Sequence, residues 1–144
     1  MKSEITSILK YLFFSVISCC FLCQCATMQS PTGGEKDVFA PTVLNTTPIQ
    51  GATNVNPTSI EIQFDEYFKL KNLQSELLIS PPIETKPIIY QKGKSLFITL
   101  LDSLNENSTY TFNFGKGIAD YHEGNVLKDF ALVFSTGNEL DSLS

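Results

Sequence analysis

Ser95-Leu-Phe-Ile-Thr-Leu100 and Tyr110-Thr-Phe-Asn-Phe114 are two segments in which apolar side chains occupy every second position. A period of two predicts strands that bury one face and expose the other. The polar crossover between them predicts two separate strands. The side chains expected to point inward are Leu96, Ile98, Leu100, Tyr110, Phe112 and Phe114.

Five further segments have the same strand-like character and are separated by turn residues. Lys92-Gly93-Lys94 predicts a hairpin turn. Residues 65–75 are polar and give no clear prediction, residues 115–128 are expected to form a link, and no long helical stripe is present. The five predicted strands are Val43–Thr47, Ile60–Phe64, Leu77–Ser80, Pro87–Gln91 and Phe130–Phe134.

These segments together predict about seven short strands, with turn signals roughly every 8–12 residues. Such spacing is typical of an all-β, antiparallel Ig-like β-sandwich. A single sheet could not cover the inward faces of all these strands, whereas two sheets packed about 10 Å apart could bury them against each other.

Tyr110 stands at the start of a predicted strand, after the polar crossover Leu104-Asn-Glu-Asn-Ser-Thr. This position is typical of a tyrosine corner, in which the ring packs inward and the hydroxyl bonds to upstream backbone. The alternative is an ordinary aromatic residue of the core. Tyr110 is therefore a candidate structural site.

The first residues have the pattern of a secretory signal. Lys2 and Lys10 precede the apolar run Tyr11–Leu22, and a polar, turn-rich segment follows. The apolar run is shorter than the roughly 20 residues of a membrane-spanning helix. We therefore expect an exported protein that is held at a membrane by lipid.

Two of the four cysteines compete as the acylated residue. Val16-Ile17-Ser18 before Cys19 matches the usual lipobox, whereas Cys25 has an aliphatic residue three positions earlier but a glutamine directly before it. Cleavage before Cys25 uses the whole apolar run and gives the mature chain a polar start. Cys25 is the favoured lipidation site, and Cys19 is the alternative.

The predicted organisation is a lipoprotein signal peptide at 1–24, a flexible tether at 25–40, the Ig-like sandwich at 41–138 and a tail at 139–144. Removing the signal leaves 120 residues, enough for one domain. They contain 8 lysines, 14 acidic residues and no arginine, a net charge of −6. Nucleic acid is not expected as a partner, because its binding requires a basic face.

The order of several motifs resembles the bacterial Ig-like domain of the SbsA type. The resemblance covers roughly residues 25–140. It implies an Ig-like sandwich used as a spacer or interaction module on the cell envelope, with no catalytic residues. The matching motifs are Pro41-Thr-Val43, Gly51-Ala-Thr-Asn-Val55, Ile60-Glu-Ile-Gln-Phe-Asp-Glu66, Asn107-Ser-Thr-Tyr-Thr-Phe112 and Phe134-Ser-Thr-Gly137.

No catalytic, cofactor-binding or metal site is expected. His122 is the only histidine. A Ser-His-Asp triad could be written with Asp120 and either Ser103 or Ser135, but no nucleophile-elbow sequence supports it. The loop carboxylates could attract calcium, yet the spacing of a dedicated calcium loop is absent. These carboxylates are Asp65, Glu66, Asp120 and Glu123.

Tyr67, Phe68 and Tyr121 fall outside the alternating sets, so we expect them to form a partner patch or to pack over a sheet edge. The expected function is a non-enzymatic spacer or protein-interaction module of the cell envelope. Its expected partners are the membrane, through the lipid, and an envelope protein or glycan. The alternatives are a carbohydrate-binding module, which the absence of tryptophan disfavours, and the amino-terminal stalk of a longer envelope protein.

Overall fold

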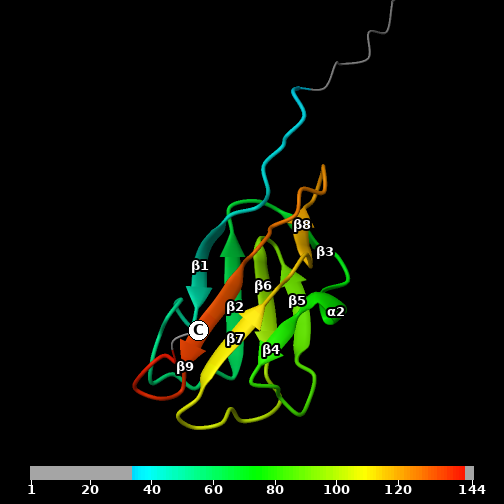
Figure 1. The fold of residues 1–144 in the computed structure, drawn as a ribbon. Coiled ribbons are helices and arrows are strands. Elements are labelled where there is room, and N and C mark those ends of the chain that lie inside the picture. Colours follow the sequence, from blue (N-terminus) through cyan, green and yellow to red (C-terminus); the bar gives the residue numbers. More distant parts are fainter. Residues whose placement is uncertain (1–33, 142–144) are drawn as a thin grey trace, which may run out of the picture. The chain divides into compact units, whose positions relative to one another are not determined.

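The computed structural model describes residues 34–141, which contain nine strands and one short helix (Figure 1). The strands are β1 (Val43–Thr47), β2 (Ser59–Phe64), β3 (Phe68–Leu70), β4 (Leu78–Ser80), β5 (Ile88–Lys92), β6 (Ser95–Thr99), β7 (Thr109–Asn113), β8 (Ile118–Asp120) and β9 (Ala131–Ser135). The helix is α2 (Leu73–Glu76).

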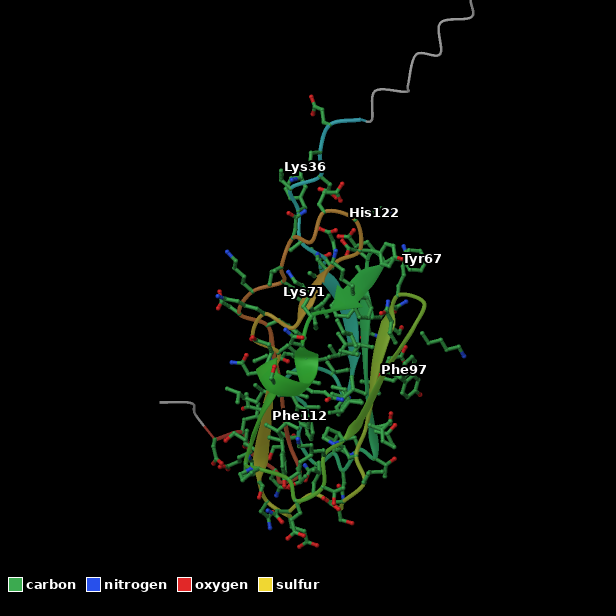
Figure 2. The ribbon with its side chains drawn as sticks, turned by 90° about the vertical axis from the view of Figure 1, so that its right-hand side faces the viewer. Lys36, Tyr67, Lys71, Phe97, Phe112 and His122 are labelled. Carbon is green, nitrogen blue, oxygen red and sulfur yellow. The ribbon has the colours of Figure 1, made fainter. Side chains whose placement is uncertain are left out.

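The strands form two main antiparallel sheets and one small ribbon. The first sheet has the order β1-β2-β6-β5, the second has the order β4-β7-β9, and the ribbon pairs β3 with β8. Figure 2 shows the two layers from the side, with Phe97 of β6 in one and Phe112 of β7 in the other. The predicted all-β, Ig-like sandwich is thus confirmed.

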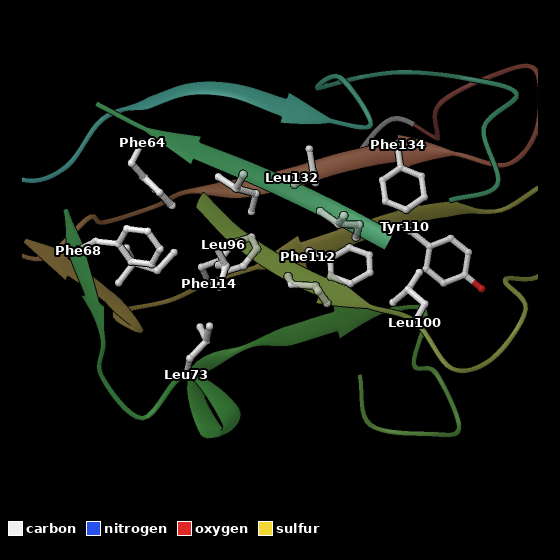
Figure 3. Close-up of a cluster of buried hydrophobic side chains, with 14 of the residues drawn as sticks. Phe64, Phe68, Leu73, Leu96, Leu100, Tyr110, Phe112, Phe114, Leu132 and Phe134 are labelled. Carbon is white, nitrogen blue, oxygen red and sulfur yellow. The ribbon is translucent and has the colours of Figure 1, made fainter. Parts of the chain in front are cut away.

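The core lies between the inward faces of the two sheets (Figure 3). The predicted inward side chains of both opening segments are buried, as are those of β2. Phe112 stacks on Phe134 with ring centroids 5.8 Å apart, and Phe64 packs on Phe68 at 4.5 Å. The alternation of the strands therefore supplies the core directly.

The two strands that the sequence did not predict are β3 and β8. Each has three residues within a polar or glycine-containing segment, and all three residues of β8 are buried. Phe68 opens β3 and is fully buried, so it cannot belong to an exposed partner patch, one of its two expected roles. Its ring belongs to the hydrophobic core, at the end of the sandwich where β3 pairs with β8.

The predicted hairpin joins β5 to β6 through a two-residue turn. Lys92 pairs with Ser95, and Gly93, the first turn residue, has φ +62°. Glycine at this position suits a type II′ turn, which needs a positive φ there. The turn fixes the β5–β6 register, and with it the face on which each β5 side chain lies.

Candidate interaction surface

Tyr110 is buried at the start of β7, and its hydroxyl accepts a hydrogen bond from the backbone N–H of Asn105 at 2.9 Å. Its ring stacks on Phe134 of β9 with centroids 6.0 Å apart. A buried tyrosine hydroxyl bonded to backbone a few residues upstream is the geometry of a tyrosine corner. Tyr110 thus ties the β6–β7 crossover to the second sheet.

The groups of the conceivable Ser-His-Asp triad have separate local roles. His122 is exposed and packs edge-on against Tyr121. Ser103 belongs to the β6–β7 crossover, and this crossover and the β8–β9 loop that carries His122 lie at opposite ends of the sandwich (Figures 1 and 2). The Ser135 Oγ accepts a hydrogen bond from the N–H of Gly137 at 3.1 Å. These positions give no triad.

The Asp120 carboxylate organises the loop between β8 and β9. It accepts hydrogen bonds from three backbone N–H groups at 2.7–3.0 Å, those of Glu123, Gly124 and Asn125. Burial raises the pKa of Asp120, but the N–H bonds favour the ionised form, and the net effect is a lowered pKa. Asp120 is a structural residue of this loop.

Asp65 and Glu66 follow β2 in different environments. The Thr42 hydroxyl donates to Asp65 Oδ2 at 2.6 Å and holds the pKa of Asp65 below its usual value. Burial, with the nearby charges of Asp65 and Asp120, raises the pKa of Glu66. Among residues 34–141, no group of three histidine, cysteine or acidic side chains could hold a metal ion. Asp65 serves instead to fix the start of β1 against the end of β2.

Tyr67 and Tyr121 are exposed at the ends of β3 and β8, which pair antiparallel. The N–H of Tyr121 donates to the Tyr67 carbonyl at 3.1 Å, and the Lys94 ammonium lies 5.6 Å from the centre of the Tyr67 ring. These contacts place both tyrosines at the end of the small ribbon. Of the three aromatics outside the predicted core, these two are surface residues.

The sandwich has two seams where the edges of its sheets meet, and the seam between β1 and β9 is closed by main chain. The N–H of Gly51 donates to the Val133 carbonyl at 2.7 Å, and the N–H of Ser135 donates to the Ala52 carbonyl at 2.8 Å. Ala52 and Phe134 form a parallel bridge. Residues 51–55 thus cover the free edge of β9.

The opposite seam, between the edge strands β4 and β5, is open. In the part of the chain that the structure describes, β5 pairs only with β6, and β4 pairs only with β7. A groove of about 250 Å³ lies between the two edges. Its lining residues are Gln74, Leu77, Ile79, Pro82, Ile83, Lys86, Pro87 and Ile89.

Apolar side chains also flank the groove on the outside. Leu78 of β4 is 68% exposed, and Ile88 and Tyr90 of β5 are 53% and 47% exposed. The groove is smaller than the roughly 300–1,000 Å³ typical of small-molecule pockets. Its size and apolar lining suit the side chains of a protein segment. We define the β5 edge with this groove as the open seam.

The sequence could not have predicted the open seam. Its groove is lined by residues of predicted strands and turns, but β4 and β5 belong to different sheets. A strand's own pattern does not reveal which neighbours it has, because strand pairing is set by tertiary contacts. The run Pro87-Ile-Ile-Tyr90 interrupts the alternation of apolar and polar residues, but this feature alone does not identify a seam between two sheets.

Two packed antiparallel sheets with a tyrosine corner define an immunoglobulin-like sandwich. Residues 37–136 match the family described as bacterial Ig-like domain, and the chain belongs to this family. The family prediction made from the sequence is therefore confirmed. Domains of this family are typically non-catalytic modules of bacterial surface proteins.

Three solved structures are similar to this chain at low identity and modest TM-scores. An L,D-transpeptidase from Mycobacterium smegmatis is 16% identical, with a TM-score of 0.45 over 67% of this chain and 40% of its own. The methionine-rich copper resistance protein PcoC from Escherichia coli is 14% identical, with a TM-score of 0.45 over 67% of this chain and 97% of its own.

The N-terminal part of the bacterial S-layer protein SbsC is 19% identical, with a TM-score of 0.43 over 69% of this chain and 24% of its own. The chain therefore matches less than half the length of the transpeptidase and of the SbsC structure. A search of curated proteins found no match.

Proposed function

We propose that this chain is a lipid-anchored, non-enzymatic interaction module of the bacterial cell envelope. Its membership in the bacterial Ig-like family carries the proposal, with the match at residues 37–136 following the predicted signal and its cysteines. The open seam supports binding over a pure spacer role, because a spacer needs no exposed apolar groove.

The anchor rests on the predicted lipidation site. Cys25, and its alternative Cys19, lie outside the residues that the structure describes. Several acyl chains hold a protein firmly at a membrane, whereas one chain binds only marginally. A tether of residues 25–40 would span roughly 20–25 Å as a random coil. Within residues 34–141, no helix is both long and apolar enough to cross a bilayer.

Glycan binding is the weaker alternative. Stacking on a sugar requires an aromatic ring with a free face. Tyr90 and Phe97 are neighbours on the outer face of the first sheet, but their rings stack on each other at 5.1 Å with an interplanar angle of 11°. One face of each ring is therefore covered by the other ring, which reduces the aromatic surface that this sheet offers to a sugar.

The proposal is tested in cells by membrane fractionation and cross-linking. Cys25→Ser is expected to release the protein from the membrane fraction, and Cys19→Ser is the matched control. A photo-cross-linking residue is placed at Ile88 on the open seam or at Leu44, an exposed position on β1. Membrane retention of both serine variants would contradict the anchor. If no partner were cross-linked from Ile88 and none from Leu44, the interaction role would be contradicted.

A further inference from the structure

We infer that the open seam binds an extended segment of a partner protein, which adds as a strand to β5 and carries acidic residues at both ends. This inference rests on the proposed function and names the partner's chemistry. An exposed sheet edge can accept a strand because its free N–H and C=O groups give affinity, while alternate side chains give specificity. The structure specifies both sets of groups.

The hairpin register determines which β5 backbone groups are free. Lys92 and Ser95 close the two-residue turn, so they form a hydrogen-bonded pair, and hydrogen-bonded pairs then recur at every second residue. Residues 88, 90 and 92 therefore bond to β6. The backbone N–H and C=O groups of Ile89 and Gln91 therefore point away from β6, toward the open edge. The C=O group of Pro87 points the same way. These groups form the docking edge.

The side chains along this edge define a charge pattern. Lys86 and Lys92 are exposed at the two ends of the segment, with Ile88 and Tyr90 exposed between them. Lysines commonly protect an edge strand from unwanted pairing. In β5 the two lysines stand at the ends and leave the apolar residues Ile88 and Tyr90 accessible between them. They are local positive charges on a chain whose net charge is −5. A complementary strand has apolar residues at its centre and acidic residues six positions apart.

The same lysines disfavour a second copy of this chain as the occupant. We consider the two symmetric antiparallel registers in which Ile89 lies opposite Ile89 or Gln91 of the second copy. In these, Lys86 lies opposite either Lys92 or Lys94 of the second copy. Like charges directly opposite each other destabilise a strand pair. The lysines instead complement an acidic partner strand.

The groove can accept side chains from the inner face of the partner strand. Ile79 and Ile83 line it beside the partly buried Ile89. Because successive side chains of a strand point to opposite faces, every second residue of the added strand would enter this groove. The residues between them would lie beside Ile88 and Tyr90. The partner segment is therefore apolar on both faces at its centre.

The first test uses the peptide acetyl-Glu-Val-Val-Thr-Val-Val-Glu-amide and its counterpart with lysine at both ends. Calorimetry with the purified full chain in detergent is expected to show at least ten-fold tighter binding of the acidic peptide. The Lys86→Glu/Lys92→Glu variant is expected to reverse this preference. Lys116→Glu/Lys128→Glu makes the same change in charge elsewhere and is expected to preserve it. Equal binding of the two peptides, or an unreversed preference, would overturn the inference.

The second test examines the backbone pairing. Ile89→Pro and Ile89→Ala both shorten a side chain that lines the groove, but only Ile89→Pro also removes the outward N–H. The proline variant is therefore expected to bind the acidic peptide more weakly than the alanine variant, and equal binding of the two variants would overturn the backbone pairing. Hydrogen exchange of the native chain is expected to slow at the Ile89 and Gln91 amides when this peptide binds. Exchange that slows elsewhere but not on β5 would overturn the inference. A cellular cross-link at Leu44 but not at Ile88 would overturn it too, while leaving the proposed interaction role intact.

Discussion

The Tyr110 hydroxyl accepts a hydrogen bond from the backbone N–H of Asn105, 2.9 Å away and five residues upstream. This bond crosses from β7 to the polar segment that connects the two sheets. The connecting segment leads from β6 in the first sheet to β7 in the second sheet. The hydrogen bond therefore holds the crossover between the two sheets in place.

Tyr110→Phe keeps the buried ring and removes this bond. The N–H of Asn105 then loses its partner in a partly buried position, and we expect the free energy of unfolding to fall by about 1–2 kcal/mol. Urea unfolding followed by circular dichroism measures the change. Tyr90→Phe is the control, because Tyr90 is 47% exposed. Equal stability of the two variants would show that the Tyr110 hydroxyl does not stabilise the crossover.

Gly137→Ala tests the closure of the domain after β9. A Cβ at Gly137 would lie 2.9 Å from the Asn107 Cα, a backbone atom that cannot move aside without shifting the β6–β7 crossover. We expect a loss of about 1–3 kcal/mol in the free energy of unfolding. Gly34→Ala is the control, because nothing lies within 4 Å of its added Cβ. A Gly137→Ala protein as stable as the Gly34→Ala protein would contradict this close contact.

Asp120→Asn tests the carboxylate that holds the β8–β9 loop. The folded pKa of Asp120 lies below its ordinary value of 3.8, so its stabilisation is present above that value and is lost as the pH falls through the folded pKa. We expect Asp120→Asn to lower the melting temperature at neutral pH. The difference in melting temperature between the variant and the native protein is expected to become smaller in acid. Thermal unfolding across this pH range measures it.

Asp129→Asn is the control for this experiment, because Asp129 is an exposed residue of the same loop. A pH-independent difference between the Asp120→Asn and native proteins would mean that the ionised carboxylate is not what stabilises the loop.

The sequence predicted seven strands because most of them alternate apolar and polar residues and end at turn residues. Ile60, Ile62 and Phe64 illustrate this, since all three are fully buried. It did not predict β3 and β8, because their three residues each lie in polar or glycine-containing segments. The buried position of Phe68 was missed for the same reason. The equally short β4 was predicted from its apolar run, which ends at Pro81-Pro82. The open seam was missed because the pairing of β4 and β5 depends on contacts between distant parts of the chain.

The intact mass of the native protein, purified from the membrane fraction, tests the lipid-anchored module most directly. The account predicts the mass of a chain that begins at Cys25 and carries several acyl groups. A mass that corresponds to the uncleaved chain, or to a cleaved chain without acyl groups, would contradict it.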